Sequence, residues 1–333
     1  MRLCWIGRSK AVVGGLALAL AGAACAWAGP EIPSGSFNEF LAGVKTQAEA
    51  AGIHPATLAV LNGLSPSARV IRLDHQQPEL TLTFNSYIRG VVTPARIAEG
   101  RRMMIRNRTI LRRIERRYGV QPRFVVALWG IESDFGKVMG TYPVVRSLAT
   151  LAWHGRRASF FRGELIDALR IIDRGDAGVR TLRGSWAGAM GQCQFMPSTY
   201  LKYAQDMNGD GKRNIWTNRG DALASAANYL AKLGWNPTET WGRKVRLPRR
   251  FDQKLIGLGT RKTLAAWSRL GVRRADGRKL PRRAGMSGSI VLGQAGRGPA
   301  FLVYDNFRSI LQWNRSTLFA LAVGKLSDDI GRR

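Results

Sequence analysis

The chain has 333 residues, of which 45% are hydrophobic and 22% charged, enough to bury a sizeable core in one unit of two or three lobes. Its 52 Lys and Arg against 22 Asp and Glu give a net charge of +30, which favours a polyanionic partner. If a leader is removed after Ala28, Cys193 is the only cysteine left, which excludes a disulfide framework.

The first 28 residues have the pattern of a secretory signal peptide. Arg2, Arg8 and Lys10 precede the apolar stretch AVVGGLALALAGAAC, and the cleavage pattern Ala26-Trp27-Ala28 follows. The stretch is too short for a stable membrane span, and no other stretch is long and apolar enough for one. Export predicts a periplasmic location, while Cys25 also permits a lipoprotein at the outer membrane. An acidic cell-wall polymer or an anionic membrane surface is therefore favoured over nucleic acid as the partner.

Helical spacing of apolar residues dominates the first two thirds of the chain. Ser36 is placed to cap the first helix, and Pro122 suits the first position of a later one. Helices are predicted over 36–53, 54–64, 93–120, 122–133, 147–175 (with a break near 154–155), 221–235, 260–272 and 307–330. Short β-like runs occupy 244–248, 289–293 and 300–306.

The predicted fold class is therefore α+β, mainly α. We expect an α lobe over 35–118 that is completed by the helix at 305–330, a core over 119–243 and a small β-containing lobe over 244–304. Within the segment 93–120, Ile105, Ile110, Leu111 and Ile114 can form one apolar stripe. Its many arginines are either a solvated helix face or a patch for polyanions.

Glu132 lies in the stretch ALWGIESDFG, at the end of the helix predicted over 122–133. Counting back three, four and seven residues places it on the face of Trp129, Leu128 and Val125, which should pack inward. Burial and the negative end of the helix dipole both disfavour the ionised carboxylate, so its pKa should be raised, as a general acid requires. The alternative is a glutamate that caps the helix or pairs with an arginine.

A partner carboxylate for Glu132 is not evident. A glycosidase ordinarily uses two carboxylates across the scissile bond. Asp134 is near in sequence, but two residues along a helix place it about 200° round. Asp167, Asp173 and Asp176 have no spacing that singles one out. A reaction that needs one acid/base fits this pattern better than ordinary hydrolysis.

A glycine-punctuated stretch, GSWAGAMGQCQFMPSTY, covers 184–200. Small residues permit close backbone approach to a ligand, aromatic faces can stack on a sugar ring, and side-chain amides and hydroxyls can hydrogen-bond it. The side chains with these properties are Trp186, Phe195, Ser185, Gln192 and Gln194. The alternative is a tight packing loop with core aromatics.

The stretch DMNGDGKRNIWTNRGD, over 206–221, has the spacing of a calcium loop. Asp206, Asn208 and Asp210 take its first, third and fifth positions, followed by the required glycine. Lys212 can give its backbone carbonyl, and Asp221 can close the shell in place of the usual glutamate. We expect structural Ca²⁺, which would suit a chain without disulfides. The alternative is an Asx-rich turn.

Together these stretches resemble the membrane-bound lytic murein transglycosylase B family. The resemblance covers most of the chain after the leader, through FVVALWGIESDFG, LATLAWHGRRASFF, GSWAGAMGQCQFMPSTY, DMNGDGKRNIW, ANYLAKLGW and ILQWNRSTLFALAVGKL. It implies a lysozyme-like core between an α lobe and a small β lobe. It also implies an exported enzyme, without organic cofactor, that cleaves the β-1,4 bond between N-acetylmuramic acid and N-acetylglucosamine in peptidoglycan. We expect a monomer.

The resemblance further implies roles for single residues. Glu132 is then the sole catalytic acid/base, and the muramyl C6 hydroxyl attacks C1 to give a 1,6-anhydro product. The implied glycan contacts are Arg156, Arg157, Ser185, Trp186, Gln194, Phe195, Tyr229 and Asn314. The implied calcium ligands are Asp206, Asn208, Asp210, Lys212 and Asp221. The chain departs from the family in an extra residue before Asp221 and in Phe319, where an aromatic with a hydroxyl is commoner.

Three other functions stay open from sequence. A lysozyme-type hydrolase would use water instead of the C6 hydroxyl and leave reducing ends. A non-catalytic wall-binding protein would lack lytic activity. A basic nucleic-acid binder would lose its affinity steeply with salt, and the signal peptide argues against it.

Overall fold

The computed structural model describes residues 35–75, 83–294 and 297–332, so the predicted signal peptide and Cys25 lie outside the described residues. The chain divides into two compact units, Met1–Leu80 with Leu128–Tyr229, and Thr81–Ala127 with Leu230–Arg333. The expected division into an α lobe, a core and a β lobe stays a prediction. Within the described ranges, no helix combines the length and apolar character that crossing a membrane requires.

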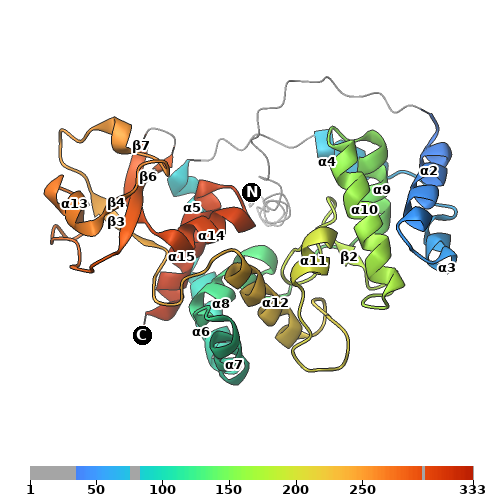
Figure 1. The fold of residues 1–333 in the computed structure, drawn as a ribbon, viewed down its shortest axis with the longest axis horizontal. Helices are drawn as coiled ribbons and strands as arrows, with labels where there is room; N and C mark the ends of the chain where they lie inside the picture. Colours follow the sequence, from blue (N-terminus) through green and yellow to red (C-terminus); the bar gives the residue numbers. More distant parts are fainter. Residues whose placement is uncertain (1–34, 76–82, 295–296, 333) are drawn as a thin grey trace, which may run out of the picture. The chain divides into compact units, whose positions relative to one another are not determined.

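The first unit is mainly helical (Figure 1). Its elements are α2 (Phe37–Ala50), α3 (Pro55–Leu58), η2 (Ala59–Leu61), α4 (Ala68–His75), the end of α8 (Pro122–Ser133), α9 (Val144–His154), α10 (Ala158–Asp173), α11 (Pro197–Tyr203), most of α12 (Arg219–Lys232), and the paired strands β1 (Tyr142–Pro143) and β2 (Arg183–Gly184). Helix α10 runs beside α9 and also contacts α2, α3 and α11. Leu165 and Leu169 of α10 are fully buried, so this helix forms the centre of the unit's core.

Two helix boundaries of the first unit follow the sequence. Ser36 caps α2 in a capping box, because its hydroxyl accepts a hydrogen bond from the Glu39 backbone N–H (3.3 Å) and the Glu39 carboxylate accepts one from the Ser36 N–H (2.6 Å). The predicted break near His154 is confirmed, since α9 ends there and Gly155 leaves the helical conformation.

The second unit carries one five-stranded antiparallel sheet. Its strands are β3 (Gly242–Arg246), β4 (Lys262–Thr263), β5 (Arg273–Arg274), β6 (Ser287–Gln294) and β7 (Arg297–Val303), in the order β4-β6-β7-β3-β5. Ile290 of β6 lies opposite Leu302 of β7, and both are fully buried. Trp267 of α13 (Leu264–Arg269) packs into the same core, and its indole N–H donates to the Gly288 carbonyl (2.9 Å). The run predicted over 289–293 lies within β6, and those over 244–248 and 300–306 overlap β3 and β7, whereas residues 305–306 already belong to α14.

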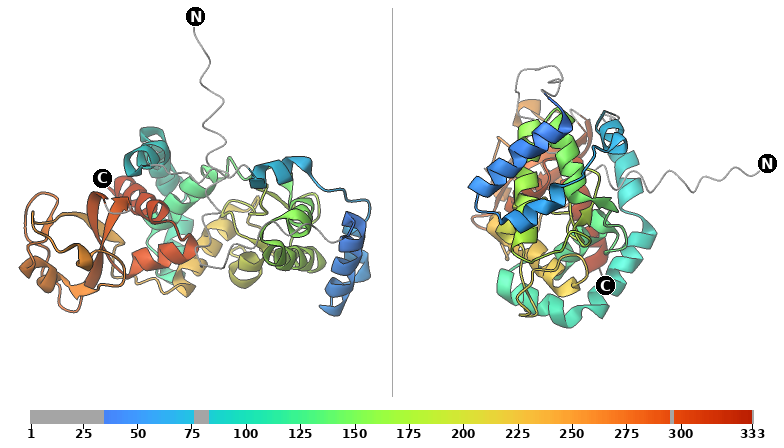
Figure 2. Two further views of the ribbon diagram at one scale, coloured as in Figure 1. Left: turned by 90° about the horizontal axis from the view of Figure 1, so that it is seen from above. Right: turned by 90° about the vertical axis from the view of Figure 1, so that its right-hand side faces the viewer.

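Helices complete the second unit (Figures 1 and 2). They are α5 (Phe84–Val91), α6 (Pro94–Arg106), α7 (Arg108–Tyr118), the start of α8, the end of α12, the short η3 (Gln253–Leu255), α14 (Asp305–Trp313) and α15 (Thr317–Gly331). Helix α15 contacts α5, α6, α14 and β6, which makes it the central helix of this unit. The helical segment predicted over 307–330 is interrupted, because α14 ends at Asn314 and Ser316 caps α15.

The basic segment over 93–120 also consists of two helices, α6 and α7, which meet at Asn107. The Asn107 side-chain amide donates to the Met103 carbonyl (2.8 Å) at the end of α6. Because α7 starts a new helical register, Leu111 and Ile114 are buried as predicted, whereas Ile105 is 75% exposed. Placing Ile105 in the apolar stripe was wrong. The α+β, mainly α class is confirmed.

Candidate active site

Helix α8 holds Glu132 in a rigid, apolar setting. The residues over 124–131 are almost all apolar and buried, and Glu132 itself is only 9% exposed. The helix ends one residue later, and Asp134 and Phe135 follow in left-handed backbone (φ 49° and 60°), which costs free energy for non-glycine residues. Asp134 therefore lies beyond the helix, and its position cannot be counted on the helical wheel.

Phe135 folds back onto the helix and fixes its end. Its backbone N–H donates to the Trp129 carbonyl (3.2 Å), and its ring lies edge-on to the Trp129 ring, with 5.6 Å between centroids. Gly130 makes this possible, because a Cβ there would come within 2.7 Å of the Phe135 ring. The last turn of α8, which carries Glu132, is thus held by a hydrogen bond and by ring packing.

The glycine-punctuated stretch forms a compact turn in the same unit. The Ser185 N–H donates to the Ala189 carbonyl (2.8 Å), and the Ser185 hydroxyl accepts from the Ala189 N–H (3.0 Å). Gly188 has φ 90°, and a Cβ there would come within 2.5 Å of Leu148, so the turn needs glycine at this position. Ser185 and Trp186 are 5% and 8% exposed. This geometry is compatible with both alternatives given for the stretch, a tightly packed loop and a loop that contacts a ligand.

Gln192 connects this turn to helix α8. Its side-chain Oε1 accepts from the Trp129 indole N–H (3.0 Å), and its Nε2 donates to the Trp216 carbonyl (3.1 Å). Its backbone carbonyl accepts from the Ser133 hydroxyl (2.7 Å), and its N–H donates to the Ile215 carbonyl (3.0 Å). Both amide groups of Gln192 thus bond inside the protein, and the expectation that Gln192 also hydrogen-bonds a ligand stays a prediction.

Cys193, which follows Gln192, has a thiol whose pKa depends on burial and on the charge of Glu132. Burial raises the pKa of the Cys193 thiol well above its usual range, and the charge of Glu132 raises it further. The thiol is therefore neutral and donates to the Ala222 carbonyl (2.9 Å). Glu132 thus has a neutral, buried thiol nearby.

Gln194, Phe195 and Tyr229 come together beside the turn. Gln194 has φ 51°, and its amide donates to the carbonyls of Met139 (3.0 Å) and Gly191 (2.9 Å). Phe195 is 2% exposed and lies edge-on to Tyr229, with ring centroids 5.5 Å apart. Burial raises the pKa of Tyr229 to about 12, so its phenol stays neutral. Phe195 thus supports Tyr229 from within the core and presents little ring surface of its own.

The two predicted arginine contacts differ in setting. Arg156 is exposed, between α9 and α10. Arg157 is half-buried, and its guanidinium lies over the Phe160 ring, 4.1 Å from the centroid. Asn314 belongs to the second unit, where it ends α14 and its side chain accepts from the Ser316 N–H (3.0 Å). Phe319 also lies in that unit and is fully buried in α15.

Four of the predicted calcium ligands lie in the loop between α11 and α12, and the fifth, Asp221, lies in the first turn of α12. The Asp206 carboxylate accepts from the N–H groups of Gly209 (2.6 Å) and Gly211 (2.8 Å), and the Asp210 carboxylate accepts from the Lys212 N–H (2.8 Å). Asn208 donates its amide to Asp210 (2.9 Å). These oxygen donors have the chemistry that a hard cation requires.

Asp221 is the fully buried member of this set. Its two oxygens accept from the N–H groups of Met207 (2.8 Å) and Asn214 (2.9 Å), so it joins both ends of the loop. Burial raises the pKa of Asp221, and the charges of Asp206 and Asp210 add to this. The donor chemistry therefore fits calcium. However, within 35–75, 83–294 and 297–332 no three His, Cys, Asp or Glu side chains lie close enough together to hold a metal ion.

A family model, the transglycosylase SLT domain, matches residues 36–328. The chain belongs to this family. The family's membrane-bound lytic murein transglycosylase B of Escherichia coli (strain K12) is 32% identical over 258 residues, which is 73% of this chain and 66% of that protein. The expected family and enzyme class, the peptidoglycan lytic transglycosylases, are confirmed.

Solved structures of the family agree. SltB3 of Pseudomonas aeruginosa, in complex with NAG-anhNAM-pentapeptide, has 44% identity and a TM-score of 0.86, and the match covers 89% of this chain and 80% of that one. The lytic transglycosylase Slt35 of Escherichia coli, in complex with calcium, has 27% identity and a TM-score of 0.74, with 91% and 98% covered. The lysozyme-like architecture expected from sequence is that of these enzymes.

One buried carboxylate was missed from sequence. Glu164 of α10 is 4% exposed, and its oxygens accept from the Ser198 N–H (2.9 Å) and hydroxyl (2.7 Å), at the start of α11. Burial raises the pKa of Glu164, and the bonds from Ser198 oppose this. Counting along α10 would have found it, because Phe161 and Ala168 share its face and are buried. Glu164 caps a helix, which is the role that the sequence analysis gave as the alternative to catalysis for Glu132.

Proposed function

We propose that this chain cleaves the β-1,4 bond between N-acetylmuramic acid and N-acetylglucosamine in peptidoglycan, with Glu132 as the single acid/base. The observation that supports this most is the burial of Glu132 at the fixed end of α8, in the same unit as Ser185 and Gln194, in a chain of the transglycosylase family. A buried carboxyl group in apolar surroundings keeps its proton more readily than an exposed one, which suits a general acid.

In this reaction the Glu132 carboxyl group gives up one proton and later takes up another. Glu132 donates its proton to the glycosidic oxygen as the bond from that oxygen to C1 of the muramyl residue breaks. The ionised Glu132 then takes the proton of the C6 hydroxyl, whose oxygen forms the new bond to C1. The carboxyl group is protonated again, no water is consumed, and the nucleophile belongs to the substrate, so a second carboxylate is unnecessary.

The products distinguish this reaction from its alternative, hydrolysis by water on the same scaffold. Mass spectrometry of sacculi digested by the purified chain should show anhydromuramyl ends, lighter than reducing ends by one water. Reducing ends alone would establish the hydrolase instead. Intact sacculi that bind the protein without release of fragments would establish a wall-binding protein.

The substrate contacts and the metal belong to the same proposal. Arg156, Arg157, Ser185, Trp186, Gln194, Tyr229 and Asn314 contact the glycan, and Phe195 acts by supporting Tyr229. Asp206, Asn208, Asp210, Asp221 and the Lys212 carbonyl hold Ca²⁺, which stabilises the loop and takes no part in the chemistry. The loop's oxygen donors support this assignment.

Export completes the proposal. The protein is processed after Ala28 and works in the periplasm, as its charge and its peptidoglycan substrate require. N-terminal sequencing of the protein recovered from the periplasm checks this, because a chain that begins at Gly29 excludes lipidation at Cys25.

A further inference from the structure

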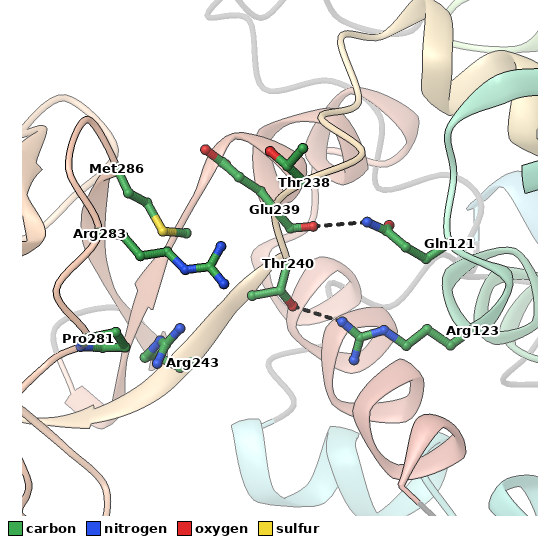
Figure 3. A pocket seen from close by; sticks show the side chains of 9 residues that line it. All are labelled: Gln121, Arg123, Thr238, Glu239, Thr240, Arg243, Pro281, Arg283 and Met286. Carbon is green, nitrogen blue, oxygen red and sulfur yellow. Dashed lines mark hydrogen bonds between the residues drawn. The ribbon is translucent and has the colours of Figure 1, made fainter. Parts of the chain in front are cut away.

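The second unit contains a cavity of about 340 Å³ that has no part in the proposed chemistry. Figure 3 shows its lining side chains, which are Gln121, Arg123, Thr238, Glu239, Thr240, Arg243, Pro281, Arg283 and Met286. Three guanidinium groups therefore line one cavity, with a single carboxylate among them. Such a volume accommodates a small ligand or one end of a larger one.

The charges of the cavity are not balanced within the described residues. Arg123 is neutralised by Asp328 (2.8 Å) and donates to Thr240 (3.2 Å). Arg243 donates through Nε to the Tyr304 hydroxyl (2.7 Å), which carries no charge to offset it. Arg283 makes no ion pair with another described residue and is exposed. Among the described residues, Arg243 and Arg283 therefore form no ion pair, although the Glu239 carboxylate lines the same cavity.

Two further observations concern the same cavity. Burial raises the pKa of the Tyr304 phenol, Arg243 and Arg283 lower it, and Glu239 raises it, so charges of both signs act on the hydroxyl that Arg243 contacts (2.7 Å). In addition, Oε2 of Glu239 is buried without a hydrogen-bond partner among the described residues, and burial raises the pKa of Glu239.

We propose that this cavity binds the free carboxylate of a short peptide, between Arg243 and Arg283. Guanidinium groups pair with carboxylates through two parallel hydrogen bonds. Met286 and Pro281 offer apolar surface beside Arg283 for a small side chain (Figure 3). The inference rests on the proposed function, because peptidoglycan is a glycan that carries peptides with such carboxylates. It names a peptide site separate from the residues that contact the sugars.

Equilibrium binding tests the cavity without any catalytic step. The full chain should bind N-acetyl-dialanine with a free carboxylate saturably in calorimetry or NMR titration, and should not bind the C-terminal amide. The double variant Arg243→Gln/Arg283→Gln should weaken binding at least tenfold. The matched double variant Arg249→Gln/Arg250→Gln, which changes two exposed arginines outside the cavity, should leave binding unchanged.

Other outcomes overturn the assignment. Binding of inorganic phosphate without the peptide would make the cavity a phosphate site. Equal binding of peptide and amide, or loss of binding in the control variant, would exclude carboxylate recognition by these arginines. In turnover, the Arg243→Gln/Arg283→Gln variant should raise KM for peptide-bearing glycan and leave peptide-free glycan unaffected. If the chain binds the peptide but cleaves no glycan, the proposed function is wrong, whereas the assignment of the cavity as a peptide-carboxylate site remains supported.

A second inference concerns Gln192 and rests on different contacts. Gln192 bonds to Trp129 and Ser133, which flank Glu132 on α8, and to Ile215 and Trp216, which lie in the loop of the predicted calcium ligands. It is 6% exposed, so its bonds are shielded from competing water. We infer that Gln192 is a positioning residue, which holds the end of α8 against the loop and so fixes the Glu132 carboxylate. This inference also rests on the proposed role of Glu132.

A double-mutant cycle tests the positioning role. Gln192→Met keeps the backbone bonds and removes both side-chain bonds, and Trp129→Phe removes one of the same bonds from the other side. Each should lower kcat roughly 10- to 100-fold with little change in KM, and should shift the pH profile, because a small displacement of a catalytic group is costly. The double variant should be no worse than the more damaging single one. Gln205→Met, which removes an amide that donates to the neighbouring carbonyls of Tyr203 and Ala204, is the control.

The readouts separate positioning from stability. Unchanged kcat and pH profile in Gln192→Met, or additive losses in the double variant, would overturn the inference. A lower melting temperature with normal kcat would show that Gln192 only stabilises the fold.

Discussion

Replacing Glu132 by glutamine should abolish the release of anhydromuramyl fragments, with a loss of roughly 10²–10⁴-fold. Glutamine has nearly the same shape and keeps the packing at the end of α8, but it can neither donate the proton to the glycosidic oxygen nor accept one from the C6 hydroxyl. Both steps depend on the same side chain, so the loss should appear in kcat more than in KM. Mass spectrometry of digested sacculi, with circular dichroism to confirm the fold, measures it.

Glu164→Gln is the matched control for this prediction. Both glutamates are buried on helix faces, at 9% and 4% exposure, but Glu164 caps α11 through Ser198. Its variant should therefore change stability and keep activity. Full activity in Glu132→Gln, or an equal loss in both variants, would remove Glu132 from the mechanism.

Replacing Asp221 by alanine should destabilise the protein by about 2–4 kcal/mol even in the presence of a chelator. The variant leaves the N–H groups of Met207 and Asn214 without their acceptor, and an unsatisfied buried donor costs about 1–3 kcal/mol. Urea unfolding at fixed pH, with EGTA and with excess calcium, measures both this effect and the metal's contribution. The wild-type chain should be more stable in calcium, because a ligand that binds only the folded state stabilises it.

Asp210→Ala separates the two roles of the loop. Asp210 is exposed and bonds within the loop, so its loss should scarcely change stability in EGTA but should remove the gain from calcium. A wild-type chain with the same stability in calcium, magnesium and EGTA would contradict the metal assignment. It would leave Asp221 as a purely structural residue.

Much of the fold could be predicted from local patterns. Ser36, Pro122 and His154 mark helix ends through chemistry that acts within a few residues, and the structure has helix boundaries at all three. The predicted burial of Glu132 is confirmed, although residues 124–133 of α8 are buried on every side, so the helical face did not decide it. Helical counting failed for Ile105, where a single asparagine divided the segment into two helices and the register was lost.

Less of the candidate site than of the fold could be predicted from the sequence. Gln192 bonds to residues 63 and 24 positions away, Trp129 and Trp216, so no spacing indicates that its amide is used internally. Phe195 carries the aromatic face that sugar stacking requires, yet the fold turns this ring towards Tyr229. In both cases the residue type is compatible with ligand binding, and the structure adds internal contacts that no local spacing indicates.

The division of the chain has a consequence for the order in which the protein folds. Each compact unit combines two separate stretches of sequence, and the boundaries at 127–128 and 229–230 fall inside α8 and α12. During synthesis the first unit is therefore incomplete until position 229 has been made, and the second until the C-terminal helix has been made. Such a chain has little native structure to lose while it is incomplete. If the chain is exported as proposed, this delay is useful, since a chain that reaches its destination before folding need not be unfolded on the way.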